Sequence, residues 1–445
     1  MKLFCRIVHV VLLGACGAWI CASVETGAAA VPNLAVTDML LGAVRDGVFS
    51  QLFVSPDAQH LVYAAKLSGQ IRMVVDGHPQ RAFTAIDPNS PIYSPDSSRL
   101  AYVARIKAQW FVVADGLPQH KQYDQISRLM FSPDSLHFAY IAGLGGKQFV
   151  VVDAAEGARY DSVGGLTFSA DSQHMAYFAK QGAKWFIVLD GVAQVERYDA
   201  ISGLTFSPDG LRLGFFARKD ARFFAVIDGV AGPFYDNIGG LVFSPDSLRA
   251  AYFALLGGKW FTVVDGIEGE KRDAVGGLVF SPDSTHFAYF ARLAGKWFAV
   301  ADGAEGLLYD SVGGLIFSPD SAHVAYNAVK QGKSFAVVDG AEGKRYAEIA
   351  NVPLIRLDPS VKTFSDNVDR ATALRGIGVV FGPDSAHVAY IARKIDRWVV
   401  VADGAETLQY NSNVPLIGVA FDAAKKLHAV MMRSNRVLFV DITIQ

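Results

Sequence analysis

The feature that most constrains this chain is a motif, Phe-Ser-Pro-Asp-Ser, that recurs at a fixed spacing. Copies and close variants of it begin 37 or 38 residues apart at Phe131, Phe168, Phe206, Phe243, Phe280 and Phe317. Looser copies begin at Val54, Tyr93, Phe381 and Phe421, which extends the series to ten repeats. A period of this size marks an architecture in which each repeat is one supersecondary unit that buries its apolar surface against its neighbours.

The repeat that contains Phe280 shows what each unit is expected to form. Gly276–Phe280 is a short β-rich run, and the Ser-Pro-Asp-Ser that follows is a turn, because Pro presets φ and Asp and Ser cap turns. The apolar runs His286–Ala291 and Trp297–Ala301 are separated by a Gly-containing hairpin loop. We predict that Tyr309–Val312 forms a fourth, shorter strand. Each repeat is therefore expected to be a four-stranded antiparallel sheet.

The second strand of each repeat is apolar on both faces. In one copy, Phe287, Tyr289 and Ala291 lie on one face and Ala288 and Phe290 on the other. A sheet that faces water on one side would alternate polar and apolar residues, so each sheet is expected to be sandwiched between its neighbours. Radial repetition of four-stranded sheets is a β-propeller, and we predict an all-β propeller of about ten such repeats. A β-solenoid is the structural alternative.

The turn motif followed by His-x-Ala-Tyr resembles the WD-like "PD" propeller repeats of TolB-like proteins. The resemblance extends over about residues 47–442 and implies a propeller fold, but a fold of this kind does not fix a function. Only residues 31–46 lie between the expected leader and the first repeat, so an N-terminal α/β domain like that of TolB is not expected. A Tol–Pal role is therefore not expected either.

Residues 1–30 are typical of a signal peptide. Lys2 and Arg6 form a basic start, residues 7–22 an apolar stretch, and Ala28–Ala30 a cleavage site of small residues. An uncleaved N-terminal anchor is one alternative. Leu13-Gly-Ala-Cys16 also resembles a lipoprotein signal, which would place a lipid anchor at Cys16. A periplasmic or secreted location is predicted, with an outer-membrane lipoprotein as the alternative and no transmembrane span in the mature chain.

The cysteines and the charge balance narrow the classes of ligand. Cys5, Cys16 and Cys21 all lie in the leader, so the mature chain is expected to have no disulfide and no thiolate metal site. The formal charge is -2, and removal of Lys2, Arg6 and Glu25 with the leader would make it -3. This near balance argues against nucleic acid as a partner. We expect a monomer with no cofactor.

The two chain ends predict how the fold closes. Residues 437–445 match the third strand of a repeat, and residues 34–45 lie where a missing fourth strand would be. We predict that the N-terminal closing segment, residues 31–46, completes the last sheet of a propeller that spans residues 47–445. One ring closed in this way would remove two open edges, and two smaller rings are the alternative.

One irregularity interrupts the period, since Phe317 and Phe381 are 64 residues apart. The extra segment, at about residues 350–374, is an insertion. Long loops on a repeat scaffold often carry function, and a tolerated surface insertion is the alternative.

Charged and aromatic residues next to the hairpin loops are the candidate partner-binding surface. In a propeller these loops lie on one rim, while the Ser-Pro-Asp and Asp-Gly turns lie on the other. We therefore predict a basic-rich face and an acidic-rich face that could steer a charged partner. Ordinary solvated turns and Trp packing between sheets are the alternatives. The candidate residues are Lys147, Lys184, Trp185, Lys259, Trp260, Lys296, Trp297, Lys333, Arg397 and Trp398.

Neither the histidines nor a search for known catalytic motifs indicates a catalytic site. One position after the turn holds His60, His137, His174, His286, His323 or His387, and Arg99, Arg212 or Arg249 in other repeats, which predicts a structural hydrogen-bonding role. Neither Gly-x-Ser-x-Gly nor His-Glu-x-x-His occurs.

We therefore predict an exported, non-enzymatic scaffold that binds a protein, peptide or glycan through a rim or an axial channel. The alternative is a propeller enzyme that acts on an ester, lactone or glycan at the channel mouth. Its groups would come from the non-repeating residues His78, His120, Asp220, Asp366 and Asp369.

Overall fold

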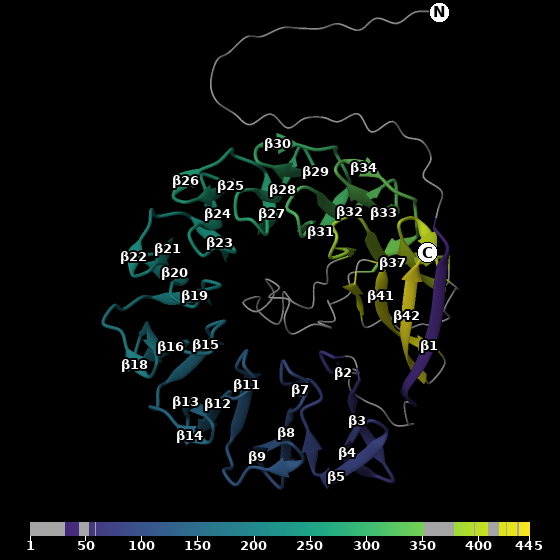
Figure 1. Ribbon diagram of the computed structural model, residues 1–445. Helices are drawn as coiled ribbons and strands as arrows, with labels where there is room; N and C mark the ends of the chain where they lie inside the picture. The colour runs from purple at the N-terminus through teal and green to yellow at the C-terminus, as the bar shows by residue number, and fades with distance from the viewer. Residues whose placement is uncertain are drawn as a thin grey trace, which may run out of the picture. The chain divides into compact units, whose positions relative to one another are not determined.

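The computed structural model describes residues 32–43, 53–57, 59–350, 378–395, 397–407, 418–423, 425–433 and 436–445 (Figure 1). Every regular element in these residues is a β-strand, and no helix among them is long and apolar enough to cross a membrane. The predicted signal peptide, Cys16, and the acidic residues Asp366 and Asp369 lie outside the described residues.

The strands of the described residues form ten antiparallel sheets, which we number 1 to 10 along the chain. Sheets 3 to 8 are alike, and neighbours within each pair in chain order. Their first strands are β11 (Gln125–Phe131), β15 (Ser162–Phe168), β19 (Ala200–Phe206), β23 (Asn237–Phe243), β27 (Ala274–Phe280) and β31 (Ser311–Phe317). Their second strands are β12 (Phe138–Leu144), β16 (Met175–Gln181), β20 (Leu213–Lys219), β24 (Ala250–Leu256), β28 (Phe287–Leu293) and β32 (Val324–Lys330).

The third and fourth strands of these six sheets are equally regular. The third strands are β13 (Lys147–Val152), β17 (Lys184–Leu189), β21 (Arg222–Ile227), β25 (Lys259–Val264), β29 (Lys296–Ala301) and β33 (Lys333–Val338). The fourth strands are β14 (Ala155–Glu156), β18 (Val192–Ala193), β22 (Val230–Ala231), β26 (Ile267–Glu268), β30 (Ala304–Glu305) and β34 (Ala341–Glu342). Repeated four-stranded antiparallel sheets of this kind are the blades of a β-propeller, which confirms the predicted all-β fold class.

The remaining four sheets vary this plan. Sheet 1 consists of β2 (Phe53–Val54), β3 (Leu61–Leu67), β4 (Gln70–Val75) and β5 (His78–Phe83). In sheets 2 and 9 the first strand is in two pieces. Sheet 2 consists of β6 (Ala85–Ile86), β7 (Ile92–Tyr93), β8 (Leu100–Ile106), β9 (Gln109–Ala114) and β10 (Leu117–Pro118). Sheet 9 consists of β35 (Glu348–Ile349), β36 (Val379–Phe381), β37 (Val388–Lys394), β38 (Arg397–Ala402) and β39 (Ala405–Glu406).

The predicted fourth strand at Tyr309–Val312 is wrong. The fourth strand of sheet 7 is β30, which pairs with β29 directly after the turn at Asp302 and Gly303. Both turn residues have positive φ, 46° and 85°, as in the type I′ turns that reverse a hairpin within two residues. Tyr309 makes only an isolated bridge to Trp297, and Ser311 already begins the first strand of sheet 8.

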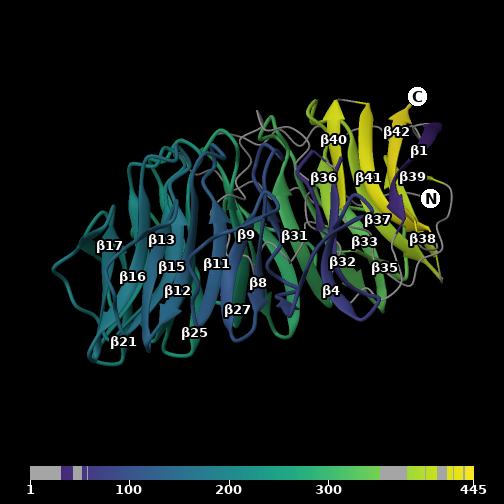
Figure 2. The same cartoon turned by 90° about the horizontal axis from the view of Figure 1, so that it is seen from below.

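Successive sheets pack face to face through apolar clusters. Phe290 of sheet 7, for example, packs with Tyr326 and Phe335 of sheet 8, and Ala288 between them is fully buried. Small alanines at this position let the sheets approach closely. Clusters of the same kind join every sheet to the next from sheet 1 to sheet 10. Figure 2 shows the strands of these sheets from below. The two-sided burial of the second strand is thereby explained.

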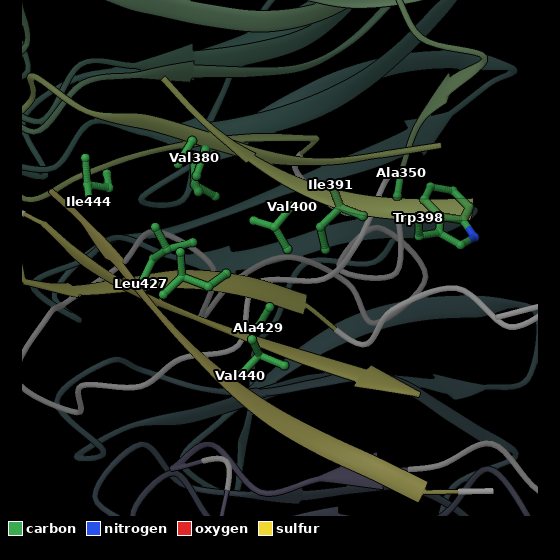
Figure 3. Packing of buried hydrophobic residues seen from close by; sticks show 12 residues of the cluster. Ala350, Val380, Ile391, Trp398, Val400, Leu427, Ala429, Val440 and Ile444 are labelled. Carbon is green, nitrogen blue, oxygen red and sulfur yellow. The ribbon is translucent and has the colours of Figure 1, made fainter. Parts of the chain in front are cut away.

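The last sheet takes its fourth strand from the other end of the chain. Sheet 10 consists of β40 (Gly418–Ala423), β41 (Lys426–Arg433), β42 (Arg436–Ile444) and β1 (Leu34–Ala43). β1 pairs antiparallel with β42, from Leu34 opposite Ile444 to Ala43 opposite Arg436. Leu34 and Val36 pack against the cluster between sheets 9 and 10, part of which Figure 3 shows from close by. Contact between sheets 1 and 10, which would close a ring, stays a prediction.

Candidate partner-binding surface

The Phe-Ser-Pro-Asp-Ser turn both caps itself and ties one sheet to the next. In sheet 7, Ser281 Oγ donates to Asp283 Oδ1 at 2.5 Å, and the amide of Thr285 donates to the same oxygen. The hydrogen bond from Ser281 lowers the pKa of Asp283 to about 2. The amide of Asp283 donates in turn to Ser321 Oγ of sheet 8 at 3.0 Å. The same bond joins Asp57 to Ser97, Asp96 to Ser135, Asp134 to Ser172, Asp209 to Ser247, Asp246 to Ser284 and Asp320 to Ser385.

The recurring His or Arg after this turn pairs with the Asp that closes the third strand. His286 Nδ1 lies 2.6 Å from Asp302 Oδ2, and Arg249 Nε lies 2.8 Å from Asp265 Oδ2. Arg249 also donates to the carbonyl of Ser284 in the next sheet. Equivalent pairs are His60–Asp76, Arg99–Asp115, His137–Asp153, His174–Asp190, Arg212–Asp228, His323–Asp339 and His387–Asp403. These side chains are therefore structural. Each closing Asp faces a basic side chain, whereas the turn Asp, such as Asp283, is held by a Ser hydroxyl and a backbone amide, so the acidic-rich face stays a prediction.

The His137–Asp153 pair predicts a pH dependence of stability. Its 2.7 Å hydrogen bond raises the pKa of His137. A raised folded-state pKa means that the contribution is complete below the unfolded pKa of about 6.5 and is lost as the pH rises through the folded pKa. We expect His137→Asn to destabilise the protein more at about pH 5 than at about pH 8, by under about 1 kcal/mol because the pair is half exposed.

Thermal unfolding at the two pH values measures this difference. Arg249→Gln is the matched control, since the arginine of the equivalent Arg249–Asp265 pair stays charged at both pH values. An effect of His137→Asn that is the same at both pH values would contradict the assignment.

At the opposite end of the sheets, the end with the hairpins between second and third strands, the predicted basic residues are paired. Lys147 lies 2.6 Å from Asp161, Lys184 2.5 Å from Asp199, Lys259 2.8 Å from Asp273 and Lys296 2.5 Å from Asp310. The other oxygen of each Asp accepts from a hairpin amide of the next sheet, as Asp161 does from Gly182. Each pair therefore joins two neighbouring sheets, and these four lysines do not form the predicted basic-rich face.

The candidate tryptophans pack between sheets. Trp185, Trp260 and Trp297 are half-buried and form backbone bridges to Tyr198, Arg272 and Tyr309. Trp398 is 7% exposed and belongs to the cluster between sheets 9 and 10. These side chains are parts of the core and leave no exposed aromatic platform of the kind that stacks on sugars.

Lys333 departs from this pattern, and Arg397 lies at the equivalent start of β38. The position that holds Asp in the preceding joints holds Ala347 after Lys333, so Lys333 has no carboxylate at the equivalent place. The sequence carried this signal as an Ala in a column of Asp residues. His78, His120 and Asp220, named for the enzyme alternative, lie in three different sheets or their loops. Among the described residues, no group of three or more His, Cys, Asp or Glu side chains could hold a metal ion.

The first strand of a sheet contains a β-bulge, and the residues at this bulge differ from the repeat in a second group of sheets. In sheet 7 the register of β27 and β28 shifts between Gly276 and Val279, and Gly277 has φ +65°. Sheet 3 holds Arg128, with φ 55°, at this bulge. Sheet 2 holds Asp87–Pro91 there, with the buried Ser90 donating to the carbonyl of Asp87.

Sheet 9 carries the insertion at the same bulge. Ile349 pairs with Ala392, the Ala350 amide donates to the Ile391 carbonyl, and Val379 pairs with Tyr390. The pairing on β37 is therefore continuous, and residues 351–377, which lie outside the described part, enter between two adjacent positions of the first strand. The insertion thus leaves the sheet intact.

No protein-family model and no curated protein matches the sequence. Among solved structures, the chain is similar to the β-propeller domain of the Trilobed protease from Pyrococcus furiosus, with 15% identity, 59% of this chain and 97% of that chain covered, and a TM-score of 0.30.

Two other solved structures cover more of the chain. A eukaryotic initiation factor has 13% identity, coverage of 69% and 91%, and a TM-score of 0.46. The dihydro-heme d1 dehydrogenase NirN in complex with DHE has 12% identity, coverage of 69% and 77%, and a TM-score of 0.36. Similarities of this size say nothing about activity.

Proposed function

We propose that this protein is an exported, non-enzymatic β-propeller scaffold that binds a protein, peptide or glycan where its surface departs from the repeat. The proposal rests on one observation: the charged side chains that recur in every repeat are engaged in contacts that hold the fold together. At the hairpin end of the regular sheets, Lys–Asp pairs join neighbouring sheets. At the other end, His–Asp or Arg–Asp pairs lie within each sheet, and the turn amide binds a Ser of the next sheet. Recognition of a partner is left to the side chains that the repeat does not use.

Those departures occur in a few sheets. The bulge position holds Asp87–Pro91 in sheet 2 and Arg128 in sheet 3, and it receives the insertion in sheet 9. At the hairpin end, Ala347 takes the place of the Asp found in the joints between sheets 2 and 8, and the β-branched Ile395 occupies a turn position that in other sheets holds Gly or an unbranched residue. Irregular positions on a regular scaffold are where binding residues are generally found. The resemblance to TolB-like repeats and the predicted signal peptide support export to the periplasm or the medium.

Binding of the labelled, purified protein to peptide and glycan arrays tests the proposal. The comparison is a variant returned to the repeat by Arg128→Gly, Ala347→Asp and Ile395→Gly, which removes two positive-φ side chains and is expected to keep the fold. We expect defined ligands that the natural protein retains and the variant loses. If both proteins retain the same ligands, or neither retains any, the proposal is wrong.

A further inference from the structure

We propose that the hairpin end of the joint between sheets 8 and 9 is a docking surface for an acidic peptide segment of a partner protein. This surface, called the 8–9 surface below, is made by Lys333, Lys344, Lys394, Ile395 and Arg397. The inference rests on the proposed scaffold function and names its partner chemistry. Three independent departures from the repeat coincide at this joint.

The first departure is a missing carboxylate. In the joints between sheets 3 and 8, an Asp before each first strand accepts from the hairpin of the following sheet, as Asp310 does from the amide of Gln331. In the joint between sheets 7 and 8, Asp310 also binds Lys296 at 2.5 Å. Ala347 occupies this position in the 8–9 joint and cannot accept from Lys333, which is exposed. The ordinary neutralisation of the hairpin lysine is therefore absent here.

The second departure is an exposed apolar residue in an unfavourable conformation. Ile395 occupies the first turn position of its hairpin with φ 62° and is 82% exposed. Equivalent turns hold Gly145, Gly182 and Gly257, or the unbranched residues Ser68, Lys107, Asp220, Ala294 and Gln331 at positive φ. No other equivalent turn among the described residues holds a β-branched residue. A β-branched residue at positive φ is a genuine outlier, and such strain is found mainly at functional sites. Neither packing nor backbone geometry accounts for an isoleucine here, whereas contact with a partner would.

The third departure is a local excess of positive charge. Lys330 and Arg345 share Glu342, and Lys344 and Lys394 share Glu406. Arg393 pairs with Glu348 at 2.9 Å. With Lys333 and Arg397, seven basic side chains therefore face three described carboxylates, and Asp396 in the sequence reduces the excess to three. The same positions in the joint between sheets 7 and 8 are balanced, because their basic residues are Lys296, Lys330 and Lys333 and their acidic residues are Glu305, Asp310 and Glu342.

These three features select an acidic peptide. Two lysines that converge on Glu406 are already held in place, so an incoming carboxylate meets donors that need little further ordering. Positive surfaces attract and orient negative partners, and an exposed aliphatic side chain supplies apolar contact beside the charges. A sulfated glycan or an anionic membrane would use the charges but not a single isoleucine.

Fluorescence anisotropy with a labelled dodecapeptide, three copies of Glu-Leu-Glu-Glu, tests the assignment on the purified protein. Ala347→Asp restores the repeat's carboxylate, and we expect it to weaken peptide binding roughly tenfold while keeping or raising the melting temperature. Ile395→Gly should weaken binding several-fold and also keep the fold. Ala158→Asp adds the same charge at the loop position equivalent to Lys344 but in the joint between sheets 3 and 4, and should leave binding unchanged.

The possible results distinguish failure of the 8–9 surface from failure of the proposed scaffold function. Unchanged peptide affinity in Ala347→Asp overturns the 8–9 surface, even where array ligands show that the scaffold binds elsewhere. Equal binding of a sulfated glycan or of phosphatidylglycerol vesicles, lost in Ala347→Asp, also overturns it, because the surface would then recognise anions in general. The scaffold function itself is overturned by a different result, the array outcome in which the natural protein and the repeat-like variant retain the same ligands or retain none.

Discussion

Gly277→Ala is expected to destabilise the protein by about 2–5 kcal/mol, whereas Gly276→Ala, one residue earlier, is expected to change stability by less than about 1 kcal/mol. Gly277 has φ +65°, and a Cβ there would lie 2.9 Å from Cδ2 of Phe290. An L-residue in this region costs about 1–2 kcal/mol. Displacing a packed ring costs about another 1–3 kcal/mol.

Gly276 provides a control within the same strand. Its φ is ordinary, and no atom lies within 4 Å of a Cβ built on it. Where the backbone accepts it, Gly→Ala often stabilises by about 0.4–1 kcal/mol through the unfolded chain. Urea unfolding of the two variants beside the natural protein measures both effects. Equal destabilisation by the two alanines would show that the bulge does not depend on the close approach of Phe290.

Deletion of residues 32–43 is expected to cost roughly 5 kcal/mol or more. It removes β1, whose nine residue pairs with β42 carry backbone hydrogen bonds worth about 1 kcal/mol each. It also removes Leu34 and Val36 from the cluster between sheets 9 and 10. The unpaired edge of β42 would in addition promote association between copies.

Thermal unfolding of the truncated protein measures this loss. A synthetic peptide of residues 32–43, added to the truncated protein, should restore much of the melting temperature because it can pair with the free edge of β42. The same residues in reversed order are the control peptide. Unchanged melting after truncation would contradict a stabilising role for the closing strand.

The fold could be predicted from the sequence because each repeat contains the residues that form its turns. Phe-Ser-Pro-Asp-Ser and the apolar second strand predict the sheet and its sandwiching, and the structure has both. The fourth strand at Tyr309–Val312 was misplaced because the two-residue Asp302–Gly303 turn returns the chain at once. Treating this Asp-Gly pair as a type I′ turn would have located the strand correctly.

The charged surface was predicted less well, for a physical reason. Lys147 and Asp161 are fourteen positions apart and meet across a joint between two sheets. Because they belong to different repeats, the pattern within a single repeat does not show that they pair. The lysines therefore seemed free when they are structural. Ala347 and Ile395 are recognised as exceptions only when the contacts made at the same position in the other repeats are known, and the sequence alone does not give those contacts.

The pairing of β1 with β42 also fixes an order of events. β1 comes before every other described strand in the chain and β42 comes last, so β1 must wait until the rest of the chain has emerged before its partner is present. Each intervening sheet can pack on its predecessor as it appears, because the contacts are between neighbours. Completion of sheet 10 is then the final step, and until it occurs the nascent chain keeps a free apolar strand that must be protected from wrong partners.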